Sequence, residues 1–592
     1  MIPNLKIYDY ITTEGTSLPI EVEKRIEELR KEYLEWVYAF GEGSCETKKV
    51  KEQLAIDGLS LWWLTLIAEK SPFKNDLMYK VFKLRTIELL VDESQSKKIH
   101  LLSGDEDLKA PLTKWAAERN IEFLWEKVGS KVSRPKSWKR RVYEGSPQLL
   151  QAFLWLFYLW WRRIRKVGKA SPSEANRATF VTYFPNIDLD EAEKGRFRSR
   201  YWGQLHDLLV EMGIKVNWVL MYVDSKECSF DEALRLKDKF RKSSGDGFFL
   251  LEEFMTRSVL LGTLRDYLRL RSKGKALLRH DLFRLPASEI NFYDIFKHEW
   301  ESSVIGQVLF ENMLWYRVFQ KLFSVLPAQD FCLYLCEMIA WEKALCSVCK
   351  ERSIFTIGYQ HAALRLMDLR YFHHPPTYAD ASPYSLPLPD LLTVNGALSR
   401  GLLLKNGYPE KGLAMVEALR YLYLLDMEVK EHHPRTLLVV TGYTREENDL
   451  QLRILSQALP NLNFERVWIK PHPYTSIDET VKELGMATKV EVKSESISNL
   501  FAESDVVFTC NSTTASFEST YLGIPTISMM PEGIDLHPIL GLGVPLVASP
   551  EDLIRFVKEP KPTPLGKDVL LLDRSLKLWR EVLKSLRSKQ YK

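Results

Sequence analysis

The spacing of apolar and polar positions changes along the chain and divides it into stretches. In residues 1–95, apolar residues recur at helical spacing over 21–38 and 59–69, with few helix breakers. We interpret 1–95 as a helical amino-terminal extension. From about residue 97, short apolar runs alternate with helical stretches, which is typical of a parallel α/β sheet.

The first α/β unit is predicted over 96–430. Its strands are expected at 99–102, 178–183, 216–222, 353–359 and 391–394, with a long helical region at roughly 250–350. Residues 328–350 contain neither Gly nor Pro and are predicted to form one helix. Such a helix would separate Cys332 and Cys346 by about 21 Å at ~1.5 Å per residue, which argues against a zinc site there.

A second α/β unit is predicted over 431–565, followed by a terminal stretch, 566–592, with an amphipathic helix at 568–588. Its strands are expected at 435–442, 465–470, 490–492, 506–509 and 525–528. Ligands of such sheets bind outside the carboxyl ends of the strands. The sequence therefore predicts the α/β class, and the arrangement resembles the GT-B architecture, in which two Rossmann-like domains face a cleft.

Composition restricts the class of protein further. The 592 residues exceed what one core holds, and apolar (45%) and charged (27%) fractions are ordinary for globular proteins. A net charge of +4 argues against a general nucleic-acid partner. The seven cysteines form no secreted-type framework, the start lacks a signal-peptide pattern, and no apolar run reaches the ~18 residues of a spanning helix. We therefore expect a cytoplasmic protein.

Polar residues follow two strands of the second unit. The strand ending near Lys470 leads into His472 and Pro473, and a cation and an imidazole at a rigid strand exit suit a phosphate group. A surface turn with an incidental histidine is the alternative. Gly442 follows an earlier strand and would permit close backbone approach to a ligand, although a plain turn explains it nearly as well.

The second cluster of polar residues lies at 512–518. The strand 506–509 runs into Ser512, Thr513 and Thr514, and a helix is expected from Thr514. A helix N-terminus offers unpaired N–H groups to an anion, and the hydroxyls add donors. An ordinary N-cap is the alternative, but a cap needs one such residue. Glu518, one turn inside, could accept hydrogen bonds from a ribose or could be a solvated helix residue.

These paired elements resemble the HP and SS motifs of bacterial sialyltransferases and polysialyltransferases, and related pairs in capsule Kdo transferases and polyol-phosphate transferases. The resemblance implies that His472 and Ser512-Thr513 bind the phosphate of a CMP- or CDP-activated donor. Residues 335–342, 358–361 and 367–372 resemble a family of surface carbohydrate biosynthesis proteins, and that resemblance covers most of the chain.

An inverting glycosyltransferase needs a general base for the acceptor hydroxyl. Glu337, His361, Asp105 and Asp368 are candidates, and we favour Glu337 or His361. Glu337 lies in the predicted apolar helix, where burial would raise its pKa. A carboxylate paired with a cation and a structurally satisfied histidine are the alternatives for these two residues.

Segment 131–169 contains an intensely apolar and aromatic run at 149–161 with basic flanks. Thirteen helical residues reach only ~20 Å, short of a ~30 Å hydrocarbon core, and Trp, Tyr and basic residues favour the headgroup region. We predict a membrane-surface anchor, with a core helix or an oligomer interface as alternatives. The predicted anchor residues are Leu149, Phe153, Trp155, Trp160, Trp161, Arg162 and Arg163.

Taken together, the sequence predicts a GT-B glycosyltransferase, inverting and independent of metal or other cofactor, at the inner face of the cell membrane. The expected donor is a CMP-activated ulosonic acid, sialic-acid-like or Kdo, and the expected acceptor is a surface polysaccharide or lipid-linked glycan. The alternatives are a CDP-polyol phosphotransferase, a sugar-nucleotide epimerase of the same fold, and a non-catalytic scaffold for polysaccharide assembly.

Overall fold

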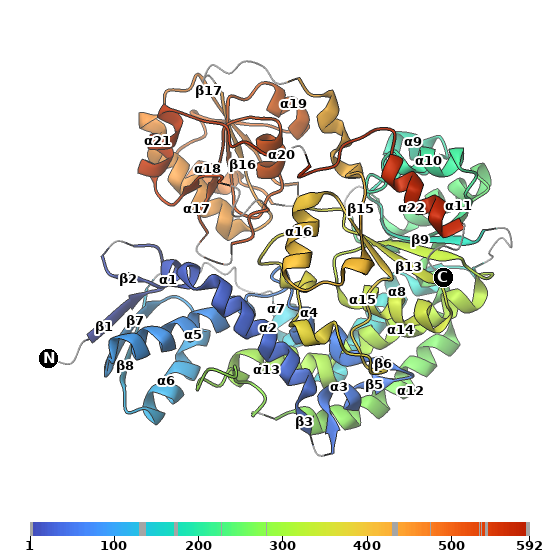
Figure 1. Cartoon of the computed structure of the whole chain (residues 1–592), viewed down its shortest axis with the longest axis horizontal. Helices are drawn as coiled ribbons and strands as arrows, with labels where there is room; N and C mark the ends of the chain where they lie inside the picture. Colours follow the sequence, from blue (N-terminus) through green and yellow to red (C-terminus); the bar gives the residue numbers. More distant parts are fainter. Residues whose placement is uncertain are drawn as a thin grey trace.

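The computed structural model describes residues 4–12, 14–45, 47–128, 138–170, 176–225, 228–279, 281–428, 436–473, 475–531, 533, 535–538, 543–566 and 568–587. Figure 1 shows three α/β parts: the amino-terminal extension in blue, a central domain in green and yellow, and a carboxy-terminal domain in orange.

The amino-terminal part contains a parallel sheet as well as helices. Its strands run in the order β2-β1-β7-β8, and β1 pairs with β7 along its full length. The strand predicted at 99–102 is confirmed as β7, but its sheet spans the boundary that the sequence placed at residue 95. The bounds are β1 (Asn4–Tyr8), β2 (Thr16–Ser17), β7 (Lys98–Ser103), β8 (Glu122–Lys127), α1 (Leu18–Lys24), α2 (Ile26–Glu42), α5 (Leu77–Ser94) and α6 (Lys109–Glu118).

The central domain is built on a parallel sheet with the strand order β11-β10-β9-β12-β13-β14-β15. An apolar cluster covers each of its two faces, so its strands are buried on both sides. The strand bounds are β9 (Ala178–Phe184), β10 (Val216–Tyr222), β11 (Gly247–Leu250), β12 (Phe331–Leu335), β13 (Phe355–Tyr359), β14 (Leu391–Val394) and β15 (Leu413–Met415). Its main helices are α10 (Leu205–Glu211), α11 (Phe230–Ser243), α12 (Arg257–Gly274), α13 (Tyr293–Ile305), α14 (Gln307–Val325), α15 (Ala340–Glu351) and α16 (Ala397–Lys405).

The single helix predicted over 328–350 is wrong. The chain forms β12, a short loop and then α15. Every residue of β12 is buried, so its side chains show no alternation, and periodicity alone cannot distinguish such a strand from a buried helix. The distance of about 21 Å between Cys332 and Cys346, which assumed one continuous helix, therefore does not apply.

The carboxy-terminal domain repeats the same plan with the strand order β18-β17-β16-β19-β20-β21, again parallel. In both sheets the first strand lies in the middle and the order reverses beside it, which is the Rossmann pattern. The predicted α/β class with two Rossmann-like domains is confirmed. The bounds are β16 (Thr436–Val440), β17 (Arg466–Lys470), β18 (Glu491–Val492), β19 (Val506–Thr509), β20 (Thr526–Met529), β21 (Leu546–Val547), α17 (Arg445–Ala458), α18 (Asp478–Glu483), α19 (Ile497–Ala502), α20 (Ala515–Tyr521) and α21 (Pro550–Lys558).

The chain crosses between these two domains twice. The 3-10 segment η9 (Leu419–Asp426) leads out of the central domain, and the terminal helix α22 (Lys577–Arg587) returns to it. Figure 1 shows α22 in red beside α10 and α11 rather than on the domain that precedes it. Trp579 of α22 is buried against Tyr359 of β13, with ring centroids 5.1 Å apart.

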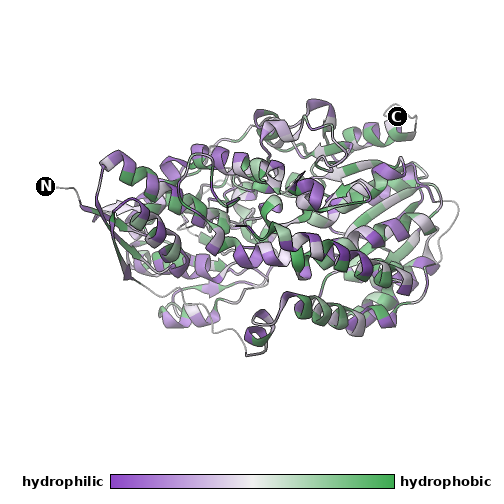
Figure 2. Cartoon of the chain, turned by 90° about the horizontal axis from the view of Figure 1, so that it is seen from below, coloured by the Kyte–Doolittle hydropathy of each residue, from purple (hydrophilic) through white to green (hydrophobic). Residues whose placement is uncertain are grey.

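Helix α8 (Gln148–Arg162) confirms the helix predicted at 149–161. It lies along the lower edge of the molecule in Figure 2, where most of its ribbon is coloured as hydrophobic. Within the described ranges, the structure contains no helix with the length and apolarity that crossing a membrane requires.

Candidate functional site

Both sheets change direction beside their first strand, and ligands of such sheets bind at the carboxyl ends of the strands at that point. In the carboxy-terminal domain the point lies between β16 and β19, which lead into Gly442 and Ser512. In the central domain it lies between β9 and β12, and β12 leads into Glu337. The predicted site residues therefore lie at the switch points of two sheets.

Gly442 lies in tight contact with the Ser512 turn. Its N–H donates to Asn448 Oδ1 (2.7 Å) and its carbonyl accepts from Asn448 Nδ2 (3.1 Å). A Cβ at this position would lie 2.9 Å from Glu447 Oε2 and 3.0 Å from Ser512 Oγ, and closer still to Cys510 Sγ. A side chain at this position would therefore have to displace the side chains of its neighbours.

Two of the three hydroxyls of the 512–514 turn donate to carboxylates. Ser512 Oγ donates to Glu447 Oε2 (2.6 Å), and Thr514 Oγ1 donates to Glu518 Oε1 (3.3 Å). Thr513 Oγ1 accepts the N–H of Ala515 (3.3 Å). Thr514 is the N-cap residue of α20, which begins one residue later than predicted, and the Thr514 side chain does not cap the helix.

The two carboxylates that accept these hydroxyl hydrogen bonds, Glu447 and Glu518, are both largely buried. Burial raises the pKa of Glu447, which the Ser512 hydroxyl opposes, and burial likewise raises the pKa of Glu518. The second oxygen of Glu518 accepts the hydroxyl of Tyr423, a residue of η9. Glu518 is therefore buried and ties α20 to the interdomain segment, so the solvated-residue alternative is wrong.

The other predicted donor-binding residues follow β17. The main-chain N–H of His472 donates to Thr441 Oγ1 (3.1 Å), which places His472 beside the β16 exit, and its ring meets that of Tyr443 edge-on with centroids 5.5 Å apart. Burial lowers the pKa of His472, so its imidazole is neutral near pH 7. Lys470 Nζ donates to the carbonyl of Ser494 (2.9 Å), and Pro473 is exposed.

Glu337 lies in the loop after β12 and not in a helix. The carboxylate of Glu342 holds this loop by accepting the N–H groups of Glu337 (2.9 and 3.1 Å) and Met338 (2.8 Å). Met338 has a φ of +58°, which fits the sharp turn made here. Burial raises the pKa of Glu337, in the predicted direction, although the side chain keeps 32% of its surface exposed.

His361 lies two residues after the end of β13, at the strand exit where it was predicted, and beside Glu337. Its Nε2 is 3.7 Å from Glu337 Oε1, and its ring lies edge-on to Tyr201 at 5.0 Å. Burial lowers the pKa of His361 to about 3, with further lowering by Arg420 and Arg370. Its Nδ1 is buried and has no hydrogen-bond partner among the described residues.

The other two candidate bases, Asp368 and Asp105, do not contact Glu337 or His361 as those two contact each other. Asp368 forms two hydrogen bonds with Arg370 (2.7 and 2.6 Å), and Arg370 lies 3.8 Å from Glu337 Oε2. Asp368 thus positions Arg370. Asp105 lies after β7 in the amino-terminal part, 3.9 Å from Lys80 Nζ.

An arginine that the sequence interpretation missed joins the two domains. Arg365 follows β13, and its guanidinium donates to the carbonyl of Ser512 (2.8 Å). Its Nε is buried and has no hydrogen-bond partner among the described residues, and burial lowers its pKa. Phe73, from the amino-terminal part, faces the guanidinium groups of Arg365 (5.6 Å) and Arg370 (5.0 Å). No local sequence pattern marks Arg365, because its partner is a main-chain carbonyl of the other domain.

In the ranges that the structure describes, no three His, Cys, Asp or Glu side chains are placed to hold a metal ion. All seven cysteines are buried and free.

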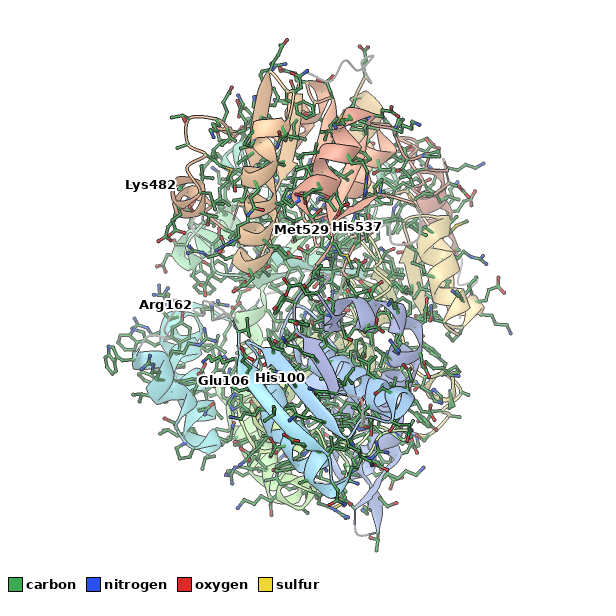
Figure 3. The ribbon with its side chains drawn as sticks, turned by 90° about the vertical axis from the view of Figure 1, so that its left-hand side faces the viewer. His100, Glu106, Arg162, Lys482, Met529 and His537 are labelled. Atoms are coloured by element: carbon green, nitrogen blue, oxygen red, sulfur yellow. The ribbon has the colours of Figure 1, made fainter. Side chains whose placement is uncertain are left out.

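Helix α8 divides the predicted anchor residues into two groups. Arg163 faces the protein, where its guanidinium donates to the carbonyl of Tyr222 (3.0 Å) and contacts Glu252 (3.3 Å). Leu149 and Trp155 pack partly against the core. The other members are exposed, and Figure 3, which labels Arg162, shows side chains of this helix projecting away from the body of the molecule. The exposed apolar residues of α8 are Leu150, Phe153, Leu154, Phe157, Tyr158, Trp160 and Trp161.

Comparison with known proteins gives distant structural likenesses. No family model matches the chain, and no curated protein sequence matches it. A UDP-N-acetylglucosamine 2-epimerase structure is 12% identical, with a TM-score of 0.39, over 71% of this chain and 98% of that one. The epimerase of Neisseria meningitidis bound to UDP-GlcNAc (10% identity, 70% and 99% coverage, TM-score 0.37) and Acinetobacter baumannii MurG (11%, 70% and 99%, 0.34) are further examples. The fold assignment rests on the strand orders of the two sheets of this chain.

Proposed function

We propose that this protein is an inverting glycosyltransferase that transfers a sugar from a nucleotide donor, without a metal or other cofactor. The observation that carries the proposal is the Arg365–Ser512 hydrogen bond. It joins the Ser512 turn to the segment after β13, which also carries His361, the neighbour of Glu337. One cluster thus offers groups suited to a leaving phosphate, and the other offers a base.

On the donor side, the phosphate would meet Arg365, the Ser512 and Thr513 hydroxyls, and the imidazole of His472. A neutral imidazole can donate one N–H to a phosphate oxygen, while the guanidinium supplies the positive charge. Preorganised donors of this kind can stabilise a leaving phosphate without a metal ion. Burial keeps the pKa of Glu447 raised, which lessens its repulsion of an anion bound at Ser512.

On the acceptor side, we assign the general base to Glu337. Its side chain is 32% exposed, whereas that of His361 is 5% exposed, so only Glu337 is well placed to meet a hydroxyl from the cleft. Burial raises the pKa of Glu337 toward the range useful to a base near neutral pH. His361 then acts as a positioning residue, because its ring packs beside the carboxylate.

The proposed donor is a CMP-activated ulosonic acid, and the proposed acceptor is a surface polysaccharide or a lipid-linked glycan. Support for a lipid-linked acceptor comes from the exposed aromatic face of α8, flanked by Arg162 and Arg165. We propose that this face holds the protein at the inner surface of the cell membrane. A CDP-polyol donor would use the same phosphate site, and an epimerase or a scaffold would not need the α8 face.

The test is a thermal-shift panel of CMP, CDP, UDP and GDP on the wild type, His472→Ala and the control His298→Ala, which alters an exposed histidine of α13. A ligand at a hundred times its Kd stabilises the folded state by about 2.7 kcal/mol. We expect CMP to stabilise the wild type and the control, and His472→Ala to lose most of the shift. CDP-selective stabilisation would favour the polyol-phosphate alternative, and indifference to all four nucleotides would overturn the enzyme proposal.

Catalysis needs its own test in the assay that the nucleotide panel identifies. Glu337→Gln is isosteric and cannot accept the acceptor proton, so we expect kcat to fall about 100- to 10,000-fold with nucleotide affinity unchanged. The acidic limb of the kcat profile should lie above the ordinary glutamate pKa, because activity appears as Glu337 loses its proton. His361→Asn should move this limb with a smaller loss of kcat. Equal activity of Glu337→Gln and wild type would refute the assignment.

A further inference from the structure

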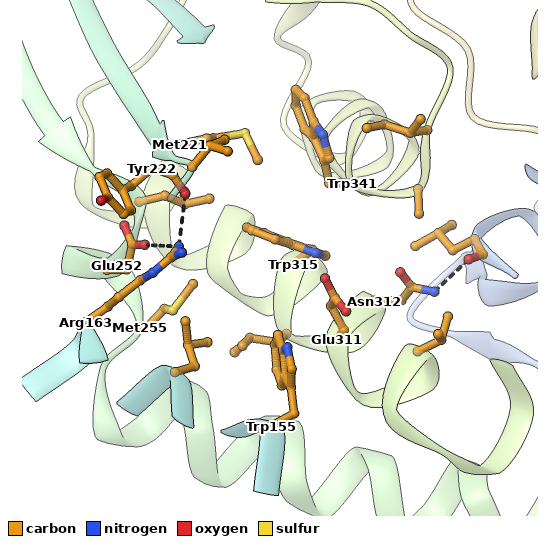
Figure 4. Close-up of a pocket in the computed structure, with 18 of the residues that line it drawn as sticks. Trp155, Arg163, Met221, Tyr222, Glu252, Met255, Glu311, Asn312, Trp315 and Trp341 are labelled. Atoms are coloured by element: carbon orange, nitrogen blue, oxygen red, sulfur yellow. Dashed lines mark hydrogen bonds and ion pairs between the residues drawn. The ribbon is translucent and has the colours of Figure 1, made fainter. Parts of the chain in front are cut away.

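A cavity of about 500 Å³ lies between α8, α14 and the carboxyl ends of the central strands. Figure 4 shows Trp155, Trp315 and Trp341 around it, together with Met221 and Met255. Its volume falls in the range of ligand-binding pockets, which are mostly apolar with a few placed polar groups. None of the residues assigned above to donor binding lines this cavity.

One end of the cavity lies beside the proposed base. Ile339, Ala340 and Trp341 line it and follow Glu337 within four residues along the chain. Trp341 Nε1 donates to the hydroxyl of Tyr183 (3.2 Å), which also lines the cavity. Burial raises the pKa of Tyr183, and the neighbouring carboxylate of Glu337 raises it further. The cavity therefore reaches the same switch point that holds the acceptor-side carboxylate.

The other end lies under α8. Trp155, Tyr158, Leu159 and Arg163 of this helix line the cavity, while Phe157 and Trp160 on the same helix are exposed. Tyr158 belongs to both sets, since it lines the cavity and is 52% exposed. The exposed aromatic face and the cavity wall are thus two sides of one helix.

Most polar groups in the cavity wall are engaged with other protein groups. Four of its charged residues pair with one another, since Lys74 Nζ lies 2.7 Å from Glu69 and the Arg163 guanidinium lies 3.0 Å from Asp224. Asn312 Nδ2 donates to the carbonyl of Leu64 (2.7 Å), and Arg163 contacts Glu252 (3.3 Å), as the dashed lines in Figure 4 show. Burial raises the pKa of Glu311, which favours its neutral form. A wall of aromatic and aliphatic side chains with such groups suits an uncharged apolar chain rather than a sugar or a phosphate.

We propose that this cavity binds the hydrocarbon chain of a lipid-linked acceptor, between the membrane face of α8 and the carboxylate of Glu337. The identification of the occupant as the acceptor rests on the proposed function. A chain entering beside Tyr158 would leave the bilayer at the exposed face of the helix and end at Trp341 and Tyr183. The head that it carries would then lie at the acceptor side of the cleft.

The test uses octyl, decyl and dodecyl maltoside below their micelle concentrations, with binding measured by calorimetry in the absence of nucleotide and membrane. We expect saturable binding that tightens about fourfold for each added methylene, the gain for burying one CH₂. Val308→Trp narrows the cavity and should weaken dodecyl maltoside at least tenfold. Leu261→Trp adds the same ring at an exposed position of α12 and should bind as the wild type does.

Two further measurements keep the outcomes distinct. Phe157→Ser alters the exposed face of α8 but not the cavity wall, so it should leave maltoside binding unchanged. Each variant must retain the cooperative thermal unfolding and the melting temperature of the wild type without ligand, which shows that it is folded. Binding that ignores chain length, or that survives Val308→Trp, would overturn the proposal. Failure of the wild type to bind any of the four nucleotides, with chain binding intact, would instead count against the proposed function alone.

Discussion

Gly442 has protein atoms on the side where a side chain would begin. Cys510, Glu447 and Ser512 all approach that position, while Asn448 holds both main-chain polar groups of Gly442. The residue thus sets the distance between the β16 exit and the turn proposed to bind phosphate. A methyl group added there must displace either the Ser512 turn or the Glu447 side chain.

Gly442→Ala is therefore expected to destabilise the protein by about 1–3 kcal/mol, the usual effect of overpacking a buried site. It should also weaken nucleotide binding, because Ser512 has to move. Urea unfolding and the thermal-shift panel measure the two effects. Gly262→Ala is the control, since its Cβ would meet no atom within 4 Å in α12 and alanine favours a helix. Equal stability of Gly442→Ala and wild type would show that the turn accommodates the methyl group.

The lowered pKa of His361 leads to a prediction about how the stability of the protein depends on pH. Its pKa is about 3 in the folded protein, against an ordinary value of 6.5. The unfolded chain therefore takes up a proton below pH 6.5 that the folded protein excludes, and stability falls as the pH falls toward 3. Above pH 6.5 this contribution is fully retained.

His361→Asn should accordingly flatten the loss of stability between pH 7 and pH 5, by roughly 2 kcal/mol. The free energy of unfolding is measured in urea at pH 7 and at pH 5 for each protein. The difference between the two values, taken separately for wild type and variant, removes any effect of the substitution that does not depend on pH. The slope should not vanish, because burial also lowers the pKa of His206 and His537 to about 3. A variant slope equal to that of the wild type would mean that His361 is protonated in the folded protein.

At the scale of elements, the sequence predicted strands best where a buried run ends in a polar exit loop. The strands predicted at 353–359, 465–470 and 506–509 are confirmed as β13, β17 and β19, and their exits hold His361, His472 and Ser512. The loop at Glu337 was misplaced because β12 is apolar on both faces. Arg365 was missed because its partner is a main-chain carbonyl of the other domain, which no local pattern reveals.

The exposed aromatic side chains of α8 lead to a prediction about membrane binding by the whole helix. Phe157, Trp160 and Trp161 are each at least 41% exposed, next to the cations that end the helix. Aromatic side chains favour the headgroup region and cations favour anionic lipid. We expect the protein to float with phosphatidylglycerol-containing vesicles, less strongly at high salt and weakly with phosphatidylcholine alone.

The triple variant Phe157→Ser/Trp160→Ser/Trp161→Ser should remain in the unbound fraction. Leu261→Ser/Leu268→Ser on α12 removes exposed leucines elsewhere and should float as the wild type does. The two variants separate a specific anchor from general stickiness. Flotation of the triple variant at the wild-type level would leave α8 as a contact surface for protein rather than lipid.

At the scale of the whole molecule, the proposed reaction needs the two domains held in register, and α22 is part of what holds them. Glu417, 2% exposed beside η9, accepts the N–H of Leu578 (2.8 Å) and of Trp579 (3.0 Å) at the start of this helix. Its main-chain carbonyl accepts the indole N–H of Trp579 (3.0 Å). A carboxylate at a helix N-terminus also interacts favourably with the helix dipole. The crossing helix is thus fixed at the residue where the chain leaves the central domain.

Glu417→Gln should loosen α22 without touching any residue assigned to donor or acceptor. The amide keeps one acceptor oxygen but turns an NH₂ toward the other N–H, which costs about 1–3 kcal/mol. Amide exchange within 577–587 should accelerate about tenfold to a hundredfold if that segment opens locally. Glu410→Gln, at an exposed ion pair with Arg400, is the control and should leave exchange unchanged.

Because the nucleotide-binding groups of the carboxy-terminal domain stay in place, CMP should still stabilise Glu417→Gln while transfer slows. Slow exchange together with full activity would mean that the Trp579 packing alone holds the crossing helix.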